Sequence, residues 1–429
     1  MTSLALHGGE PAVHHGQVQP WPPMDAGVRE AVVAALDAHQ LGYGAASATR
    51  QLEGDFSRRY GMRHAAACNS GTTALLLAYF ACGLLREEGA RPPQVIVPAY
   101  GFFATVSPLL YLDAEVVFCD VDPEIGTLDV GCLEAVITQD TQAVVVTHVT
   151  GHPVDMPAVL RATRPRGIAV IEDCSHAHGA RLDGRLVGTW GDIAAFSLQT
   201  GKLLSGGEGG IVLTDSDEHL IRLSMLGNFR RLEGTSLRPA DGLDETGLGL
   251  KLRISPLSAA LARYYLSVMD ELIDARHERL GYLTKMISAR AGDSFAPPVT
   301  RSGAFRGAFY EYHVRVAGGN QTLEFVRSAL AAEGCSLPHS NTKAIHTLPI
   351  FRRPLATSLA VVLGRTPPGA KDWPSLVRPA SMPHAEALTA ATFALPTFTF
   401  EPYELIDPYV DALAKVAEHL SSQATGASA

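Results

Sequence analysis

One lysine stands where a predicted buried strand runs into a glycine-rich loop. The apolar run 193–198 is typical of a short buried strand, and Lys202 follows within FSLQTGKLLSGGEGG, residues 196–210. Glycines let the backbone approach closely, which predicts that this lysine lies near the interior of the fold. Burial lowers the pKa of a lysine and makes its amine a nucleophile toward carbonyl groups. The alternative reading of this stretch is a surface lysine in a glycine-rich turn.

Three other features have residue types that could work with this amine. The segment NSGTT (69–73) begins an apolar helix, and a helix start offers free N–H groups and a positive dipole end to an anion such as phosphate. Phe102 follows a predicted strand in VPAYGFFAT, and Asp173 ends the strand IAVIED. Ser70, Phe102, Asp173 and Lys202 each come just after a predicted strand. Because ligands gather at the carboxyl ends of parallel strands, one site is predicted to hold all four.

A sheet must position these residues, and the order of the elements indicates its type. Predicted strands alternate with predicted helices, which favours an α/β fold with a doubly wound, largely parallel sheet. A chain of 429 residues is long enough for two domains. We expect an N-terminal arm at 1–25, a large domain at 26–274, a smaller C-terminal α+β domain at 275–420 and a flexible tail at 421–429. A Pro-rich segment at 355–383 is predicted to form a lid or surface insertion.

Composition excludes several classes of function. The formal net charge is −9 and no basic block is present, whereas nucleic-acid phosphates require clustered Lys and Arg. No apolar run approaches transmembrane length, so we expect no membrane association. The six cysteines are scattered without a CxxC pair or a His/Cys ligand spacing. This pattern predicts free thiols in a reducing cytoplasm and no metal site.

The predicted site has the groups that pyridoxal 5′-phosphate (PLP) requires. Backbone N–H groups at Gly71 and Thr72 would bind the phosphate, and Phe102 would stack beside the ring. Asp173 would keep the pyridine nitrogen protonated, which makes the ring an electron sink. Lys202 would bond covalently to the aldehyde and, once released, act as the base that moves a proton between substrate and cofactor.

The motifs together resemble the DegT/StrS-type aminotransferases, PLP-dependent enzymes of fold type I that act on keto-sugars and keto-cyclitols. NSGTTAL, VPAYGFFAT, GHPVDM, EDCSHAHGA, FSLQTGKLLSGGEGG, IHTLPIF and FALP carry the resemblance, which spans about residues 20–420. It implies a mostly parallel seven-stranded sheet between helices, and a homodimer whose subunits complete each other's sites. It also implies that Ser197 binds the cofactor phosphate. Relatives place substrate-contacting side chains in the small domain, where this chain has Tyr312, His313, His339 and His346.

Three positions depart from the family pattern. His176 replaces a usual glutamine, as in the 3-amino-5-hydroxybenzoate synthase branch; it would contact the cofactor or be an ordinary core histidine. Lys251 replaces the asparagine of a cross-subunit GxNxR pattern, which appears here as GLKLR. This lysine would reach the neighbour's phosphate, bind an acidic substrate group or simply be solvated. Gly101 stands where threonine is usual.

The resemblance implies a two-step amino transfer. L-glutamate or L-glutamine would give its amino group to the cofactor, leaving pyridoxamine phosphate, which would then aminate a ketone on a sugar, cyclitol or related ring in specialised metabolism. Relatives that dehydrate deoxysugars carry histidine at the lysine position, so Lys202 favours transfer. Two alternatives stay open: elimination or aromatisation, as in the branch that His176 resembles, and a non-catalytic regulator that retains the fold.

Overall fold

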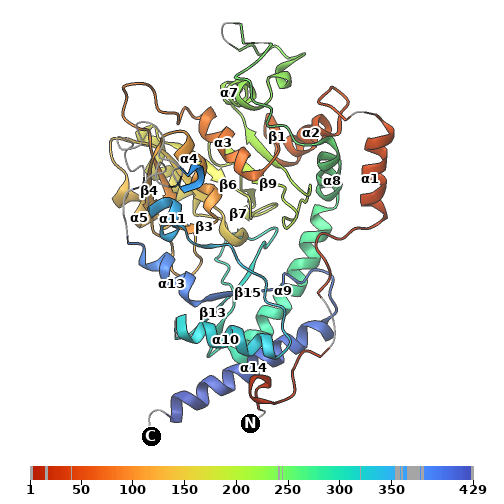
Figure 1. Ribbon diagram of the computed structural model, residues 1–429, viewed down its shortest axis with the longest axis vertical. Coiled ribbons are helices and arrows are strands. Elements are labelled where there is room, and N and C mark those ends of the chain that lie inside the picture. Colours follow the sequence, from red (N-terminus) through yellow and green to blue (C-terminus); the bar gives the residue numbers. More distant parts are fainter. Residues whose placement is uncertain are drawn as a thin grey trace.

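The computed structural model describes residues 3–14, 18–39, 41–239, 242–243, 245–318, 320–352, 358, 361–364, 377 and 381–426. A large layered part holds the N-terminal two thirds of the chain, and a smaller part is built from its C-terminal third (Figure 1). One long helix, α9 (Met269–Ala291), runs from the large part into the small one. Residue 274, the predicted domain boundary, lies inside this helix.

The large part is built on a seven-stranded sheet in the order β1-β10-β9-β6-β5-β2-β4. Strand β10 pairs antiparallel with both neighbours and the other pairs are parallel, as predicted for a mostly parallel sheet. The strands are β1 (His64–Cys68), β2 (Gln94–Pro98), β4 (Glu115–Cys119), β5 (Thr141–Thr147), β6 (Ala169–Asp173), β9 (Ile193–Ser197) and β10 (Gly210–Thr214). Two strand pairings place β1 parallel to β9, so the carboxyl ends of all strands except β10 share one edge.

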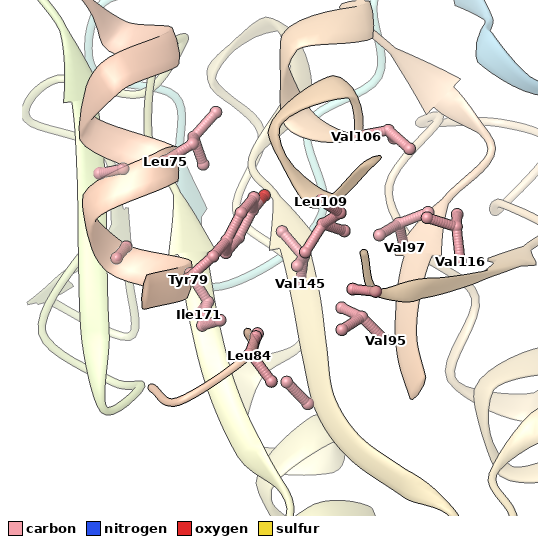
Figure 2. Packing of buried hydrophobic residues seen from close by; sticks show 14 of the residues in the cluster. Leu75, Tyr79, Leu84, Val95, Val97, Val106, Leu109, Val116, Val145 and Ile171 are labelled. Carbon is pink, nitrogen blue, oxygen red and sulfur yellow. The ribbon is translucent and has the colours of Figure 1, made fainter. Parts of the chain in front are cut away.

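Alternating residues of these strands pack on different helix layers. On β2, Val95 and Val97 pack on one face, while Ile96 packs on the other. Figure 2 shows the first face, where Leu75 and Tyr79 of α3 and Leu109 of α4 lie over the strands. The helices of the large part are α1 (Ala26–Asp37), α2 (Ala48–Tyr60), α3 (Gly71–Ala81), α4 (Ser107–Tyr111), α5 (Val130–Val136), α6 (Met156–Thr163), α7 (Asp217–Gly227) and α8 (Pro256–Ser267).

The small part packs α9, α10 (Asn320–Ala332) and α14 (Tyr403–Gly426) against a three-stranded antiparallel sheet in the order β11-β13-β15. The strands are β11 (Phe295–Ala296), β13 (Tyr312–Val316) and β15 (Thr392–Leu395). Two helices of the same third of the chain, α11 (Pro349–Arg352) and α13 (Pro383–Ala391), pack on the core of the large part. Two short pairings link distant segments: β3 (Tyr100–Gly101) with β14 (Lys343–Ala344), and β7 (Arg181–Leu182) with β8 (Arg185–Leu186) and β12 (Ala304–Phe305).

The ends of the chain differ in part from the predictions. The arm has one short 3-10 helix and is held on the small part, where Glu333 accepts hydrogen bonds from the Ala5 and Ala12 amides. The last helix continues to Gly426, so most of the predicted tail is helical. Most of the predicted lid at 355–383 lies outside the described residues. Among the described helices, none is both long and apolar enough to span a membrane.

Candidate functional site

The predicted phosphate-binding segment is a capped helix start that packs on the lysine-bearing strand. Ser70 is the N-cap of α3, and its Oγ accepts a hydrogen bond from the Thr73 amide at 3.1 Å. A Cβ atom added to Gly71 would lie 2.6 Å from Cβ of Ser197, so the close approach requires glycine. Ser70, Gly71, Thr72 and Ser197 therefore lie together on the wall of one cavity.

This cavity has a volume of about 430 Å³ and lies at the carboxyl edge of the large sheet. It brings together eight predicted site residues: Ser70, Gly71, Thr72, Phe102, Asp173, His176, Ser197 and Lys202. The expectation that residues following separate strands would meet is confirmed. The other lining residues are Leu75, Ala104, Thr105, Thr147, Ser175, Gln199, Thr200, Gly201, Glu208, Tyr310, Glu311, Asn341 and Thr342.

Lys202 is a buried amine, as the glycine-rich loop predicted. Burial lowers its pKa to about 8, against the opposing effect of the Glu311 and Asp173 carboxylates. Its Nζ lies 3.5 Å from the centre of the Tyr310 ring, a cation–π contact when the amine is charged. The N-terminal arm also reaches this loop, since Trp21 Nε1 donates to the Lys202 carbonyl at 3.0 Å. The amine is thus held in the cavity in a form that deprotonates easily.

Asp173 is a buried carboxylate held by two donors. Its Oδ2 accepts from the Thr105 hydroxyl at 2.6 Å, and its Oδ1 accepts from the Ser175 amide at 3.1 Å. The Tyr79 hydroxyl donates to the Thr105 carbonyl at 2.5 Å, which fixes the segment that carries the Thr105 hydroxyl. A carboxylate held in this way stabilises a positive charge placed beside it.

An aromatic wall closes the cavity on the side of the small part. The His176 and Tyr310 rings stack with their centres 4.2 Å apart. Burial, and next to it the charge of Lys202, holds the pKa of His176 well below its usual range, so the ring is neutral. The His176 Nδ1 accepts from the Thr150 amide at 3.4 Å. His176 is thus a buried residue that also lines the cavity, and its contact with the cofactor stays a prediction.

Five predicted contacts do not line the cavity. Lys251 is exposed, although the adjacent Leu252 carbonyl accepts from the Asn69 amide at 3.0 Å and so places Lys251 beside the phosphate-binding segment. Tyr312 is fully buried in the core of the small part, with its hydroxyl 2.7 Å from that of Thr284. Tyr312 lies there because it is the first residue of β13 and pairs with β15.

The three small-domain histidines also lie outside the cavity lining. His313 Nε2 is 2.8 Å from the Glu311 carboxylate, so it reaches the cavity only through that residue. His346 is buried, with its Nε2 2.9 Å from Oε1 of Glu386. His339 is exposed. Their expected substrate contacts stay predictions, and this chain by itself does not show them.

The aromatic loop explains one departure from the family pattern. Gly101 belongs to β3 and has φ +154°, a conformation that residues with a side chain rarely adopt. Its pairing with β14 brings the segment after Phe102 close to the segment that supplies Asn341 and Thr342. A threonine at this position would be strained, which gives the glycine a physical reason.

Comparison with known proteins decides the family. A family model described as the DegT/DnrJ/EryC1/StrS aminotransferase family matches residues 23–399. The chain belongs to this family.

Two relatives of this aminotransferase are both named as L-glutamine aminotransferases of an inosose. The L-glutamine:2-deoxy-scyllo-inosose aminotransferase of Streptomyces paromomycinus is 34% identical, over 77% of this chain and 79% of the relative. The L-glutamine:scyllo-inosose aminotransferase of Streptomyces griseus is 30% identical over 98% of both chains. The solved structure of 3-amino-5-hydroxybenzoic acid synthase aligns with a TM-score of 0.77 at 24% identity, covering 94% of this chain and 99% of that one. That likeness shows the fold.

The cofactor of this aminotransferase is PLP, and the cavity fits it. The cavity contains a capped helix start, a buried carboxylate and a lysine that deprotonates easily. The buried Thr147 Oγ1 also lines it and has no hydrogen-bond partner among the described residues, which suits a bound polar group. Which residues contact PLP stays a prediction. On this prediction, Lys202 would hold the aldehyde carbon, Asp173 the ring nitrogen and the α3 start the phosphate.

Sequence reasoning missed the small-part side of the cavity. Tyr310 and Glu311 line it, whereas the prediction named Tyr312 and His313, two residues further along the same segment. Tyr310 and Glu311 come just before β13, so the alternation of that strand does not fix the directions of their side chains. The one available signal was an acidic residue within the aromatic-rich FYEYHVRV, in a segment already expected to face the substrate.

Proposed function

We propose that this aminotransferase transfers the amino group of L-glutamine to a ketone on a polyhydroxylated carbocycle, in the biosynthesis of an aminocyclitol antibiotic. The observation that carries the proposal is the polarity of the cavity wall. Beyond the expected cofactor contacts it presents neutral side chains that can pair with hydroxyl groups: Gln199, Thr200 and Asn341. The named activities of the two Streptomyces relatives support this choice of donor and acceptor.

The residues of the cavity would divide the chemistry among them. When bound, PLP supplies an electron sink that makes the Cα–H bond of an amino acid acidic. Lys202 is the base that takes this proton. Its pKa of about 8 means that about half of the amine is neutral at pH 8 and a larger share above it. Asp173 would hold a proton at the pyridine nitrogen. The stacked His176 and Tyr310 rings cover the site and limit the entry of water.

We also propose a homodimer whose subunits share sites. Lys251 is flanked by Leu248 and Leu250, which are 49% and 48% exposed, and a second copy docked here would remove these apolar side chains from water. The segment adjoins the phosphate-binding segment, so a second copy docked there would lie near the cavity. Sedimentation velocity checks the assembly.

We also propose a cytoplasmic location. The six cysteines are free thiols, which supports this location.

A two-stage spectroscopic experiment tests the function. L-glutamine is added to the PLP-loaded protein without an acceptor, and we expect the visible absorbance band to be replaced by the near-ultraviolet band of pyridoxamine phosphate. Adding 2-deoxy-scyllo-inosose should then restore the visible band and yield an aminated product. A protein that binds PLP but responds to no amino acid would contradict the proposal. Loss of water from the acceptor without nitrogen transfer would favour the dehydrating alternative.

A further inference from the structure

The cavity holds one buried acid that the cofactor chemistry does not use. We propose that Glu311 selects the amino donor, favouring a side chain that is uncharged and donates a hydrogen bond over one that ends in a carboxylate. It would therefore favour L-glutamine over L-glutamate. The inference rests on the proposed function, because it assumes that both amino acids reach Lys202 through this cavity.

Glu311 lies where the donor side chain must pass. It lines the cavity and follows Tyr310, whose ring is in contact with the Lys202 amine. Its carboxylate is also close enough to raise the pKa of that amine. An amino acid reacting next to Lys202 therefore extends its side chain within the field of Glu311.

The charges of the cavity wall strengthen this selection. Lys202 is the one cation among the described lining residues, and the acids are Asp173, Glu208 and Glu311. Asp173 is assigned to the ring nitrogen and Glu208 is exposed. A second carboxylate on the donor would thus face a buried negative charge, with no further cation among this chain's own described lining residues. Both donors carry the same α-carboxylate, so its cost cancels in the comparison.

Three donors hold Glu311 in place as an anion. Its Oε2 accepts from Nε2 of His313 at 2.8 Å, from the Ser340 hydroxyl at 3.0 Å and from the Thr342 hydroxyl at 2.8 Å. Burial acts to raise its pKa, but His313 and the hydrogen bond from Thr342 lower it to about 2. Among the described residues, no hydrogen bond reaches Oε1. A fixed anion with an unengaged oxygen suits an amide N–H₂ group.

The first experiment compares the two donors in the PLP-loaded enzyme. The conversion rate of the cofactor is measured with L-glutamine and with L-glutamate, and the ratio of the two kcat/KM values is taken. We expect the wild type to favour L-glutamine at least tenfold, since hydrogen bonds to charged groups have this size. In Glu311→Gln the ratio should fall at least tenfold, mainly through a lower KM for L-glutamate. An unchanged ratio would overturn the inference.

Glu386→Gln is the matched control. Glu386 also accepts a hydrogen bond from a histidine Nε2, at 2.9 Å, but it lies on α13 outside the cavity lining. In Glu386→Gln, the ratio of the kcat/KM values for L-glutamine and L-glutamate should equal that of the wild type. A shift of the same size as in Glu311→Gln would show a general effect of losing a carboxylate and would also overturn the inference.

A second measurement needs no substitution, so it decides the question even if Glu311→Gln does not fold. The γ-methyl ester of L-glutamate has an uncharged side chain, but that side chain carries no N–H group. The wild type should use L-glutamine best, the ester next and L-glutamate least. An order with L-glutamate equal to or above the ester contradicts selection by charge. If none of the three donors converts the cofactor, the proposed function itself fails.

Discussion

Two neighbouring carboxylates on β6 have different surroundings, because one is held by a loop and the other lines the cavity. Glu172 and Asp173 alternate across the strand and are both buried. Glu172 accepts from the Gly188, Trp190 and Gly191 amides, each at 2.7 Å, and lies 3.1 Å from the His148 Nε2. Asp173 has two donors and lines the cavity.

The difference lies in how completely each charge is neutralised by fixed donors. The His148 Nδ1 accepts from the Val154 amide, so its proton lies on Nε2 and points to Glu172. Burial acts against the charge on Glu172, but His148 and the loop amides lower its pKa below the ordinary value. His148, Glu172 and Cys174 place ligand-type atoms within 4.8 Å of one another, yet the histidine and the carboxylate are committed to these hydrogen bonds. Glu172 therefore fixes the loop at 188–191, while Asp173 keeps capacity for a ligand.

Replacing Lys202, whose amine lies in the same cavity as Asp173, is expected to have the largest effect on activity. Lys202→Ala removes both the nucleophile and the base, so the turnover number should fall at least ~10³-fold. The visible absorbance band of the bound cofactor should also disappear. Absorbance and steady-state rates measure both effects. A variant that keeps full transaminase activity would show that Lys202 has another role.

Asp173→Asn tests the cavity face of β6. The amide keeps the shape of the side chain but carries no charge, so kcat should fall by about 10²- to 10⁴-fold. The free energy of unfolding should change by less than about 1 kcal/mol, because Asn can keep both contacts. Its Oδ1 accepts from the Ser175 amide, and its Nδ2 donates to the Thr105 hydroxyl, which can also act as an acceptor. Chemical denaturation and kinetics are measured on the same preparation. A large loss of stability would remove the contrast with Glu172.

Glu172→Ala tests the opposite face. It leaves three backbone amides and His148 without their acceptor, so the free energy of unfolding should fall by about 3–5 kcal/mol. Urea titration gives the value. Glu218→Ala is the control, because Glu218 pairs with Arg222 on the surface of α7 and should cost less than about 1 kcal/mol. Equal losses in the two variants would mean that the loop at 188–191 does not depend on Glu172.

The smallest effect is expected when Lys202 is titrated: the rate of PLP capture should change about tenfold per pH unit. The neutral amine attacks carbonyl groups, and its pKa is lowered by burial to about 8. The rate at which the cofactor-free protein captures PLP should therefore rise tenfold per unit below pH 8 and level off above it. Free lysine amine, with its ordinary pKa near 10.5, is the control and should keep rising to pH 10. If the rate of capture by the protein has the same pH dependence as the control, the Lys202 amine is exposed to water and its pKa is not lowered.

Local sequence signals predicted the large-part half of the site. An N-cap serine before an apolar helix, an aspartate at a strand end and a lysine before clustered glycines depend only on neighbouring residues. Parallel strands joined by right-handed crossovers have their carboxyl ends at one edge of the sheet, so residues after different strands met as expected. The small-part half could not be predicted in the same way. Tyr310 and Glu311 reach the cavity only because the chain returns to the large part just before β13 begins.

The motifs of the sequence thus resembled the family that the comparison then showed. The sequence by itself also predicted the type of sheet and the residues at its carboxyl edge, because alternation and capping depend on adjacent positions. Only the tertiary structure decided that Glu172 holds a loop while Asp173 lines the cavity, since the donors to Glu172 come from residues 148 and 188–191. It alone placed Glu311 beside Lys202, 109 positions earlier in the chain. Such pairings arise from packing between segments, and no periodicity within either segment specifies them.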